Sequence, residues 1–543
     1  MLRPRLSGNT KAAGAQNAVA RPSASHAVKT LPAPVNGWSV ASPLVMPEPA
    51  SARVLDNWFP TTTGVKPRGG TKRRATIASA APVVSMFAYS GNGVEKFFAA
   101  TASSVFDITT VADPDTIPAA TVTGQSGGYY SVTQLSNVAG THLYACNGAN
   151  APLYYDGSSF VKVTGATTPA ITGVTTSDLS GCFTYASRLF FLKKNSLTVH
   201  YLAVDAIGGA VGTLTLAGVM RKGGSLLFGA TWSMDAGDGL DDKAVFVSDQ
   251  GEVAVAEGID PSDPASWRIV GVYDIGVPLG PRAWVRVGGE LLIATVDGII
   301  PLSAATQGDR TQLALSAVSK PIEPEWRKEA LARNTANIEM IRWVEGRALI
   351  VSQPETFEGQ ANQAFVANIE TRKWCRWTGL DTNCLATFQG RAFFGTSLGR
   401  VVEFDTTGTD DGALYVCRLV MNDDPLGAMG ATKTLRQARA TFRATHAVTA
   451  KLSASTDYAV ATPSAPNSID DFNPSIWDAA IWDDAIWDAG RGEYQTKTTR
   501  WQSIGVTGFS FLVACQIAMG ITPAPDAEMV SIDVTFEEGG VVV

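Results

Sequence analysis

Alternating apolar and polar positions dominate the middle of the chain. One phrase recurs there: an alternating strand, a short turn of Gly, Asn, Ser or Asp, and a second strand. THLYACNGANAPLYYDG, which begins at Thr141, is an example. Period-two alternation interrupted by such a turn predicts a β-hairpin. Hairpins of this kind begin at Lys96, Thr141, Ser187, Asp242, Gly289, Gly346 and Gly390.

The spacing of these hairpins predicts a repeat architecture. Their starts lie 45, 46, 55, 47, 57 and 44 residues apart, which is the scale of a β-propeller blade of about 40–50 residues. We therefore predict a β-propeller-like domain of six to seven blades over residues 76–410. PEWRKEALARN, at Pro324–Asn334, has a proline near its first turn and strong helix formers after it. This segment predicts a helix inserted between two blades.

The pattern changes on both sides of the repeats. Beyond FDTTGTDDG, at Phe404–Gly412, the strands are longer and no longer follow the repeat. They predict a β-sandwich-like platform domain over residues 411–543. Residues 1–75 predict a basic N-terminal arm followed by an extended segment that wraps over other elements. The predicted fold class is all-β, a β-propeller plus a β-sandwich-like platform domain.

Charge is distributed unevenly along the chain. The net charge is −7, but Met1–Arg74 holds eleven Lys and Arg against two acids, so the segment is near +9 and the remainder near −16. A basic arm on an acidic body binds nucleic acid or docks on an acidic partner, and a solvated terminus is the simpler interpretation. Charged residues make up only 17% of the chain. This low value favours a surface that is partly buried against other copies or partners.

The strongest basic cluster lies in a turn bounded by Gly and Pro. It consists of Lys66, Arg68, Lys72, Arg73 and Arg74. Because Lys and Arg are the natural ligands of phosphate, contact with DNA is one interpretation. Pairing with acidic side chains of a neighbouring subunit is the interpretation that we favour. A solvated loop without a partner is the third.

A second unusual stretch is FNPSIWDAAIWDDAIWDAGRGEY, at Phe472–Tyr494, in which Ile-Trp-Asp occurs three times at five-residue steps. Five residues rotate a helical side chain by roughly 140°, and an odd step changes face in a strand, so neither element gathers the tryptophans on one side. Turns closed by Asp fit this spacing better. We predict a Trp-rich loop over residues 470–494 whose tryptophans pack inside the domain or between copies. These candidate interface residues are Trp477, Trp482 and Trp487.

Motifs for catalysis and cofactor binding are absent from the sequence. It has no GxSxG nucleophile elbow, HExxH, P-loop or Rossmann glycine pattern, and its six cysteines and four histidines form no zinc signature. A turn gathers four acids whose spacing does not match an EF-hand, so a turn cluster is favoured over a calcium site. These acids are Asp235, Asp238, Asp241 and Asp242. We expect no enzymatic activity, no cofactor and no bound metal.

Membrane insertion is not expected either. The N-terminus has charge but no apolar signal-peptide core. The most apolar run, Phe509–Ile521, has thirteen residues and is too short to span a bilayer.

Three long phrases carry a resemblance to a known family. They are LPAPVNGWS…ARVLDNWFPTTTGVKPRGG, WSMDAGDGLDDKAVFVSDQGEVAVAEGIDPSDPASWRIVGVYDIGVPLG and GGELLIATVDGIIPLS. They resemble tail proteins of short-tailed, podovirus-type bacteriophages, the nozzle or tail-tube hub proteins, and the resemblance covers most of Val35–Asp405. The three Ile-Trp-Asp units are not part of this resemblance.

The resemblance implies a structural protein of the virion tail, assembled in the host bacterial cytoplasm. The family forms a homohexameric ring below the portal and the head-to-tail adaptor ring, and genomic double-stranded DNA touches the bore transiently as it leaves. Tail-fibre or tail-tip proteins are the other expected partners. An acidic body fits this role because it repels phosphate. Two alternatives stay open: a propeller module that binds a host-surface receptor or glycan, and a hydrolase of envelope polysaccharide.

Overall fold

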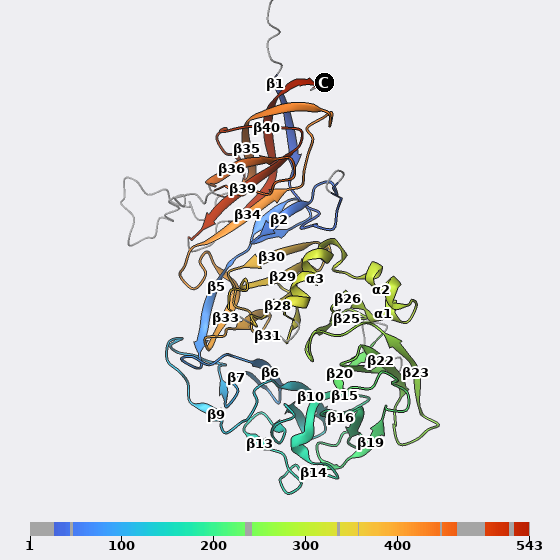
Figure 1. Cartoon of the computed structure of the whole chain (residues 1–543). Helices are drawn as coiled ribbons and strands as arrows, with labels where there is room; N and C mark the ends of the chain where they lie inside the picture. Colours follow the sequence, from blue (N-terminus) through green and yellow to red (C-terminus); the bar gives the residue numbers. More distant parts are fainter. Residues whose placement is uncertain are drawn as a thin grey trace, which may run out of the picture.

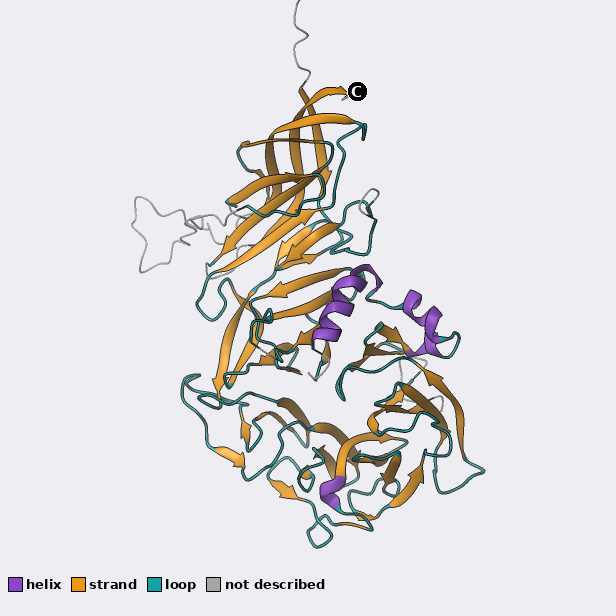
Figure 2. Cartoon of the chain, viewed as in Figure 1, coloured by secondary structure: helices purple, strands orange, loops and turns teal. Residues whose placement is uncertain are grey.

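The computed structural model of the chain describes residues 26–43, 47–233, 242–333, 337–356, 358–445, 448–463, 495–520 and 526–541. A ring of small β-sheets forms one part of the molecule, and a tall β-sandwich stands on its rim (Figure 1). Strands make up nearly all of the regular structure, and most of the helical segments lie at one side of the ring (Figure 2).

Six sheets belong to the ring alone. The first four are β6 (Ser85–Gly91), β7 (Val94–Ala100), β8 (Val105–Asp107) and β9 (Ala120–Val122); β10 (Ser131–Asn137), β11 (Gly140–Cys146), β12 (Leu153–Tyr155) and β13 (Phe160–Lys162); β15 (Leu179–Tyr185), β16 (Arg188–Lys193), β17 (Thr198–Tyr201) and β19 (Gly212–Thr215); and β20 (Leu226–Trp232), β21 (Lys243–Ser248), β22 (Glu252–Gly258) and β23 (Trp267–Asp274). The other two are β24 (Trp284–Val287), β25 (Glu290–Thr295) and β26 (Gly298–Pro301); and β31 (Cys384–Phe388), β32 (Arg391–Gly395), β33 (Arg400–Thr407) and β5 (Gly70–Thr76). A parallel ribbon of β14 (Ile171–Thr172) and β18 (Gly209–Ala210) accompanies them.

A seventh position in the ring is filled by a sheet that the sandwich shares. Its strands are β27 (Met340–Trp343), β28 (Ala348–Gln353), β29 (Gln363–Asn368) and β30 (Trp374–Thr378). Each of the seven hairpins found in the sequence is formed by the second and third strands of one of these sheets, as β11 and β12 are for the phrase at Thr141. The prediction of a β-propeller with six to seven blade-like repeats is therefore confirmed.

The blades adhere through aromatic side chains on their facing surfaces. Phe183 on β15 contacts Phe246 on β21 of the next blade, with ring centroids 5.6 Å apart. Phe97 on β7 stacks on Phe388 on β31 at 5.0 Å, which joins the first blade to the last. Successive residues of a strand face opposite sides of its sheet, so a central strand packed between two blades is buried at successive positions, as β28 is at all six.

The two ends of the propeller sequence meet in one sheet. β5 precedes the first blade in sequence but pairs antiparallel with β33 of the last blade, with Ala75 opposite Val401. The last blade is thus completed by a strand from the start of the propeller sequence, and this pairing closes the ring.

The described part of the propeller also contains five helical segments, η1 and four others near one side of the ring. They are η1 (Thr176–Asp178), α1 (Leu302–Ala305), α2 (Arg310–Ser316), η2 (Lys320–Ile322) and α3 (Glu323–Ala332). α3 lies between the blades of β24–β26 and β27–β30, where the sequence predicts a helix. It is fixed by Trp326, which is buried and donates its indole N–H to the carbonyl of Thr295 at 2.9 Å.

The second part of the molecule is a β-sandwich built from both ends of the chain. Its strands are β1 (His26–Pro32), β2 (Ala52–Asp56), β3 (Trp58–Pro60), β4 (Val65–Pro67), β34 (Tyr415–Met421), β35 (Ala431–Ala444), β36 (Ala450–Thr456), β37 (Gln495–Thr498), β38 (Gln502–Gly508), β39 (Phe511–Met519) and β40 (Ala527–Val541). β40 pairs with β35 on one edge and with β1 on the other. Within its described part, the predicted N-terminal segment of residues 1–75 therefore supplies strands to both domains.

One sheet runs without a break from the propeller into the sandwich. Its order is β27-β28-β29-β30-β2-β34-β39-β36, so β2 joins the blade to the sandwich. At this step Arg376 on β30 and Asp56 on β2 form two parallel contacts of 2.7 and 3.0 Å. The two domains are thus joined by one pair of bridged residues, Asp56 and Arg376, and by the ion pair between their side chains, in addition to the linking chain.

Candidate functional site

The basic cluster lies where the chain leaves the sandwich at β4 and enters the propeller at β5. Gly69 and Gly70 allow this passage. A Cβ atom on Gly69 would lie 1.8 Å from Oδ1 of Asp405, and one on Gly70 would lie 2.1 Å from the carbonyl oxygen of Thr409. Because backbone and side chain approach so closely, only glycine fits at both positions.

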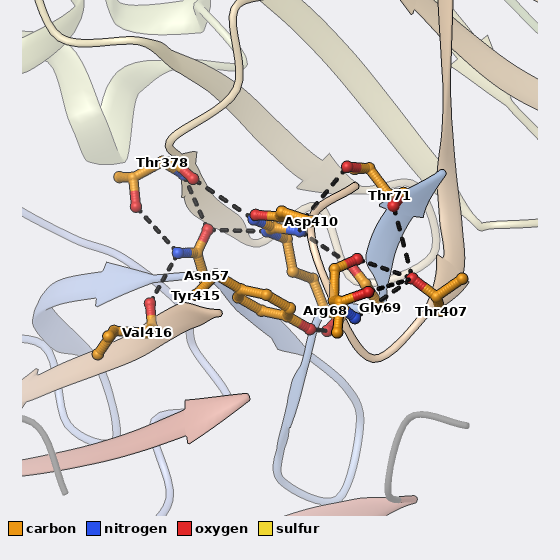
Figure 3. A network of polar contacts seen from close by, with 10 residues as sticks. Asn57, Arg68, Gly69, Thr71, Thr378, Thr407, Asp410, Tyr415 and Val416 are labelled. Carbon is orange, nitrogen blue, oxygen red and sulfur yellow. Dashed lines mark hydrogen bonds and ion pairs between the residues drawn. The ribbon is translucent and has the colours of Figure 1, made fainter. Parts of the chain in front are cut away.

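Arg68 is enclosed by its own chain, and its side chain is only 1% exposed. Its guanidinium binds both carboxylate oxygens of Asp410, with Nη2–Oδ2 at 2.6 Å and Nη1–Oδ1 at 2.9 Å (Figure 3). The same guanidinium lies 4.2 Å from the ring centroid of Tyr415. Burial lowers the pKa of Arg68, but its contacts with Asp410 raise it, and the net effect is a rise. Arg68 therefore stays charged in a buried position.

Asn57 holds this ion pair in place. Its Oδ1 accepts hydrogen bonds from Nε of Arg68 at 2.9 Å and from the backbone N–H of Thr378 at 2.8 Å. Its Nδ2 donates to the hydroxyl of Thr378 and to the carbonyl of Val416 (Figure 3). The network connects the segment before β3 with β30 of the propeller and β34 of the sandwich. It is a polar joint between the two domains.

Arg73, Arg74 and Lys66 also have partners within the chain. Arg73 pairs with Asp411 at 2.9 Å and also contacts Asp115, and Arg74 donates to the carbonyl of Thr109. Lys66 lies 3.5 Å from Asp526 at the surface, and Lys72 is exposed on β5.

The expected contact of Arg68 with a neighbouring subunit or with DNA is therefore wrong. Its partner, Asp410, lies 342 residues away in sequence and within bonding distance in the fold. A guanidinium enclosed in this way cannot reach a second molecule. For Lys66 and Lys72, whose side chains are at the surface, contact with a partner stays a prediction.

Two other predicted features fall outside the described residues. Trp477, Trp482 and Trp487 lie in 464–494, and three of the four clustered acids lie in 234–241. The fourth, Asp242, accepts a hydrogen bond from the hydroxyl of Ser233. Within the described ranges, no group of three or more His, Cys, Asp or Glu side chains is arranged to hold a metal ion. No helix in those ranges is long and apolar enough to cross a membrane.

A further site, on the propeller axis, was missed by the sequence interpretation. Nη1 of Arg282 lies 2.9 Å from Oε1 of Glu339. The same guanidinium stacks on the ring of Tyr129, 3.6 Å from its centroid. Burial raises the pKa of Glu339 to about 7, against the lowering effect of Arg282. No local motif marks these residues, because they come together only when the ring closes.

Comparisons with known proteins leave the family open. No protein-family model and no curated protein matches the chain. Three weakly similar solved structures are the computationally designed Ika8 protein (9% identity, 62% of this chain, 100% of that chain, TM-score 0.35), the Cps50 (Swd1) β-propeller domain of Myceliophteria thermophila (11%, 62%, 100%, 0.37) and PorZ, a surface component of the type-IX secretion system of Porphyromonas gingivalis (13%, 67%, 44%, 0.34). The assignment of a propeller rests on the strand topology of the chain itself.

Proposed function

We propose that the chain is a structural subunit of a bacteriophage tail, a nozzle protein whose copies form a ring that conducts the DNA genome during ejection. The observation that carries the proposal is the continuous eight-stranded sheet between the propeller and the sandwich. A subunit of a load-bearing ring has to move as one body, and this sheet provides that property.

The stiffness of the joint follows from its bonds. Rotating one domain against the other would break the pairing of β2 with β30, including the hydrogen bond from the backbone N–H of Asn57 to the carbonyl of Arg376, and the two contacts of Arg376 with Asp56. It would also separate Arg68 from Asp410 or Asn57. The guanidinium of Arg68 would then become exposed or stay buried without a partner. Such a loss is costly, since a buried charge without its partner destabilises a protein by several kcal/mol. An enzyme that closes on a substrate, in contrast, commonly uses a hinge.

The sequence phrases supply the second line of support. Those that resemble nozzle proteins supply β2 to β4, β21 to β23 and β25 to β26, which are strands of the joint and of two blades. Identical subunits close a ring through heterologous contacts, in which two different faces of each subunit meet. The proposed neighbours are the head-to-tail adaptor ring above and tail-fibre or tail-tip proteins below. Double-stranded DNA is the transient ligand of the bore.

Electron microscopy of the purified protein and of virions tests the proposal. Class averages are expected to show sixfold rings with a central bore wide enough for duplex DNA, and the same ring at the tail tip of virions. Isolated propellers in solution, together with virion density only on peripheral fibres, would overturn the proposal in favour of a receptor- or glycan-binding module. Cleavage of host polysaccharide by the purified chain would overturn it in favour of a hydrolase.

A further inference from the structure

A cavity of about 450 Å³ lies on the axis of the propeller. Its walls are residues of the innermost strands or of the segments just before them, from all seven blades: β6, β10, β15, β20, β24, β27 and β31. Clefts of about 300–1,000 Å³ are the size in which proteins bind small molecules. The cavity is far too small for duplex DNA, so the proposed conduction of the genome gives it no role.

One end of the cavity is narrowed by the side chain of Arg282. Besides its ion pair with Glu339, Arg282 donates Nη2 to the carbonyl of Val84 at 2.8 Å and to the hydroxyl of Ser85 at 3.0 Å. Glu339 in turn accepts a hydrogen bond from the backbone N–H of Leu385 at 2.9 Å. These contacts connect the beginnings of β6, β24, β27 and β31, and they therefore lie at the end of the axis where these strands start. These contacts, with the stacking of Arg282 on Tyr129, narrow the cavity at that end.

The charge of this pocket is opposite to that of the chain. Its charged lining residues are Arg282, Arg286 and Glu339, on a protein of net charge −7. Arg286 lies on β24, is exposed, and donates Nη2 to the hydroxyl of Ser233 at 3.0 Å. Within the described residues, the buried Nε of Arg282 has no hydrogen-bond acceptor. A buried donor without an acceptor calls for a bound water or ligand.

The remaining wall offers hydroxyl groups and an aromatic ring. Thr133 and Thr184 on neighbouring inner strands share a hydrogen bond of 2.9 Å, and Thr231 on the next inner strand donates to the carbonyl of Thr184 at 2.7 Å. Trp284 lines the pocket beside Arg286 and stacks on Phe228, with centroids 5.6 Å apart. Hydroxyls, an indole face and arginine together suit a small polar molecule with a negative group.

We propose that the axial pocket binds a small ligand that carries a carboxylate or phosphate group, with Arg286 as its principal cationic contact and Arg282 at the narrowed end. An arginine fork binds either oxyanion through two parallel hydrogen bonds. Two sources therefore share this chemistry: an acidic sugar of a cell envelope and free phosphate.

Isothermal titration calorimetry of the full chain tests the proposal, with glucuronate, inorganic phosphate and glucose as probes at constant ionic strength. Glucuronate or phosphate is expected to bind, and Arg286→Gln is expected to weaken that binding by about tenfold or more, since a hydrogen bond to a charged group is lost. The matched control is Arg268→Gln, because Arg268 lies on β23 and is 77% exposed. This control is expected to bind like the unchanged chain.

The outcomes of the titration distinguish an acidic sugar from free phosphate as the ligand. Binding of glucuronate but not of glucose or phosphate assigns the pocket to an acidic sugar, and binding of phosphate alone assigns it to free phosphate. No heat with either anion, or equal affinity in Arg286→Gln and the unchanged chain, overturns the proposal. Arg286 is a better target than Arg282, whose contacts hold several blades together. Because the measurement does not depend on ring formation, it fails or succeeds independently of the proposed nozzle role.

Discussion

Arg68 and Asp410 form a bidentate ion pair across 342 residues of sequence, at the joint between propeller and sandwich. The arginine is 1% exposed and the aspartate 16% exposed. A pair in this position stabilises one arrangement of the two domains, because any other arrangement leaves a buried guanidinium without its carboxylate.

Replacing Asp410 alone tests how far the stability of the chain depends on this ion pair. Asp410→Ala leaves Arg68 buried with only neutral acceptors, so the free energy of unfolding is expected to fall by about 3 kcal/mol. Urea denaturation followed by tryptophan fluorescence measures the change, because Trp58 and Trp377 are both buried near the joint.

An exposed ion pair provides the control. Arg347 and Glu370 lie 3.4 Å apart with side chains 65% and 54% exposed. Glu370→Ala is expected to change the free energy of unfolding by no more than about 0.5 kcal/mol. Equal losses in the two variants would show that the buried pair contributes no more than a surface pair.

A second prediction concerns the glycine that carries the chain into β5. In Gly70→Ala the new methyl group would meet the backbone of Thr409, which cannot move without shifting β5 away from β33. We expect a loss of about 2 kcal/mol in the free energy of unfolding. Gly430→Ala is the matched control, because nothing lies within 4 Å of the added carbon there. A loss of the same size in both variants would refute the steric explanation.

The sequence predicted the propeller because its signal is local. Each hairpin, such as the one at Thr141, shows its alternation and its turn within about twenty residues, and repetition reinforces the pattern. The helix α3 was also predictable, since Pro324 and the helix formers after it are adjacent. Features of this kind need no knowledge of distant residues.

The joint and the axial pocket depend on long-range contacts instead. A run of basic residues gives no indication that Arg68 turns inward while Lys72 stays at the surface. That outcome depends on Asp410, which is brought near only by the pairing of β5 with β33. Arg282 and Glu339 likewise lie 57 residues apart in sequence, and they come into contact only when the ring closes. Neither has a motif around it.

The pairing of both chain ends leads to a third prediction, on truncation. A chain that starts at residue 77 lacks β1 to β5, so β33, β34 and β40 lose strand partners and the last blade loses its outer strand. We expect such a chain to aggregate and to show no cooperative thermal transition. A chain that starts at residue 26 keeps all five strands and is expected to melt like the full chain. A cooperative transition in the shorter chain would show that the propeller closes without β5.

The last prediction concerns the pH dependence of stability at Glu339. Its pKa rises from an ordinary value of 4.5 to about 7, so between these values the folded chain keeps a proton that the unfolded chain has lost. Stability from this group is therefore fully present below the ordinary pKa and is lost as pH rises through 7, with a slope of up to about 1.4 kcal/mol per pH unit.

Glu339→Gln isolates this contribution, because glutamine is close in shape to the protonated acid and does not titrate. The free energy of unfolding of the unchanged chain minus that of the variant should decrease from pH 4.5 to 7.5, as measured by urea denaturation at each pH. Glu370→Gln, at an exposed position, corrects for the substitution itself. A difference that instead increases with pH would mean that the attraction of Arg282, 2.9 Å away, outweighs the burial of the carboxylate. The sign of one slope thus decides whether burial or the ion pair governs the narrowed end of the axial pocket.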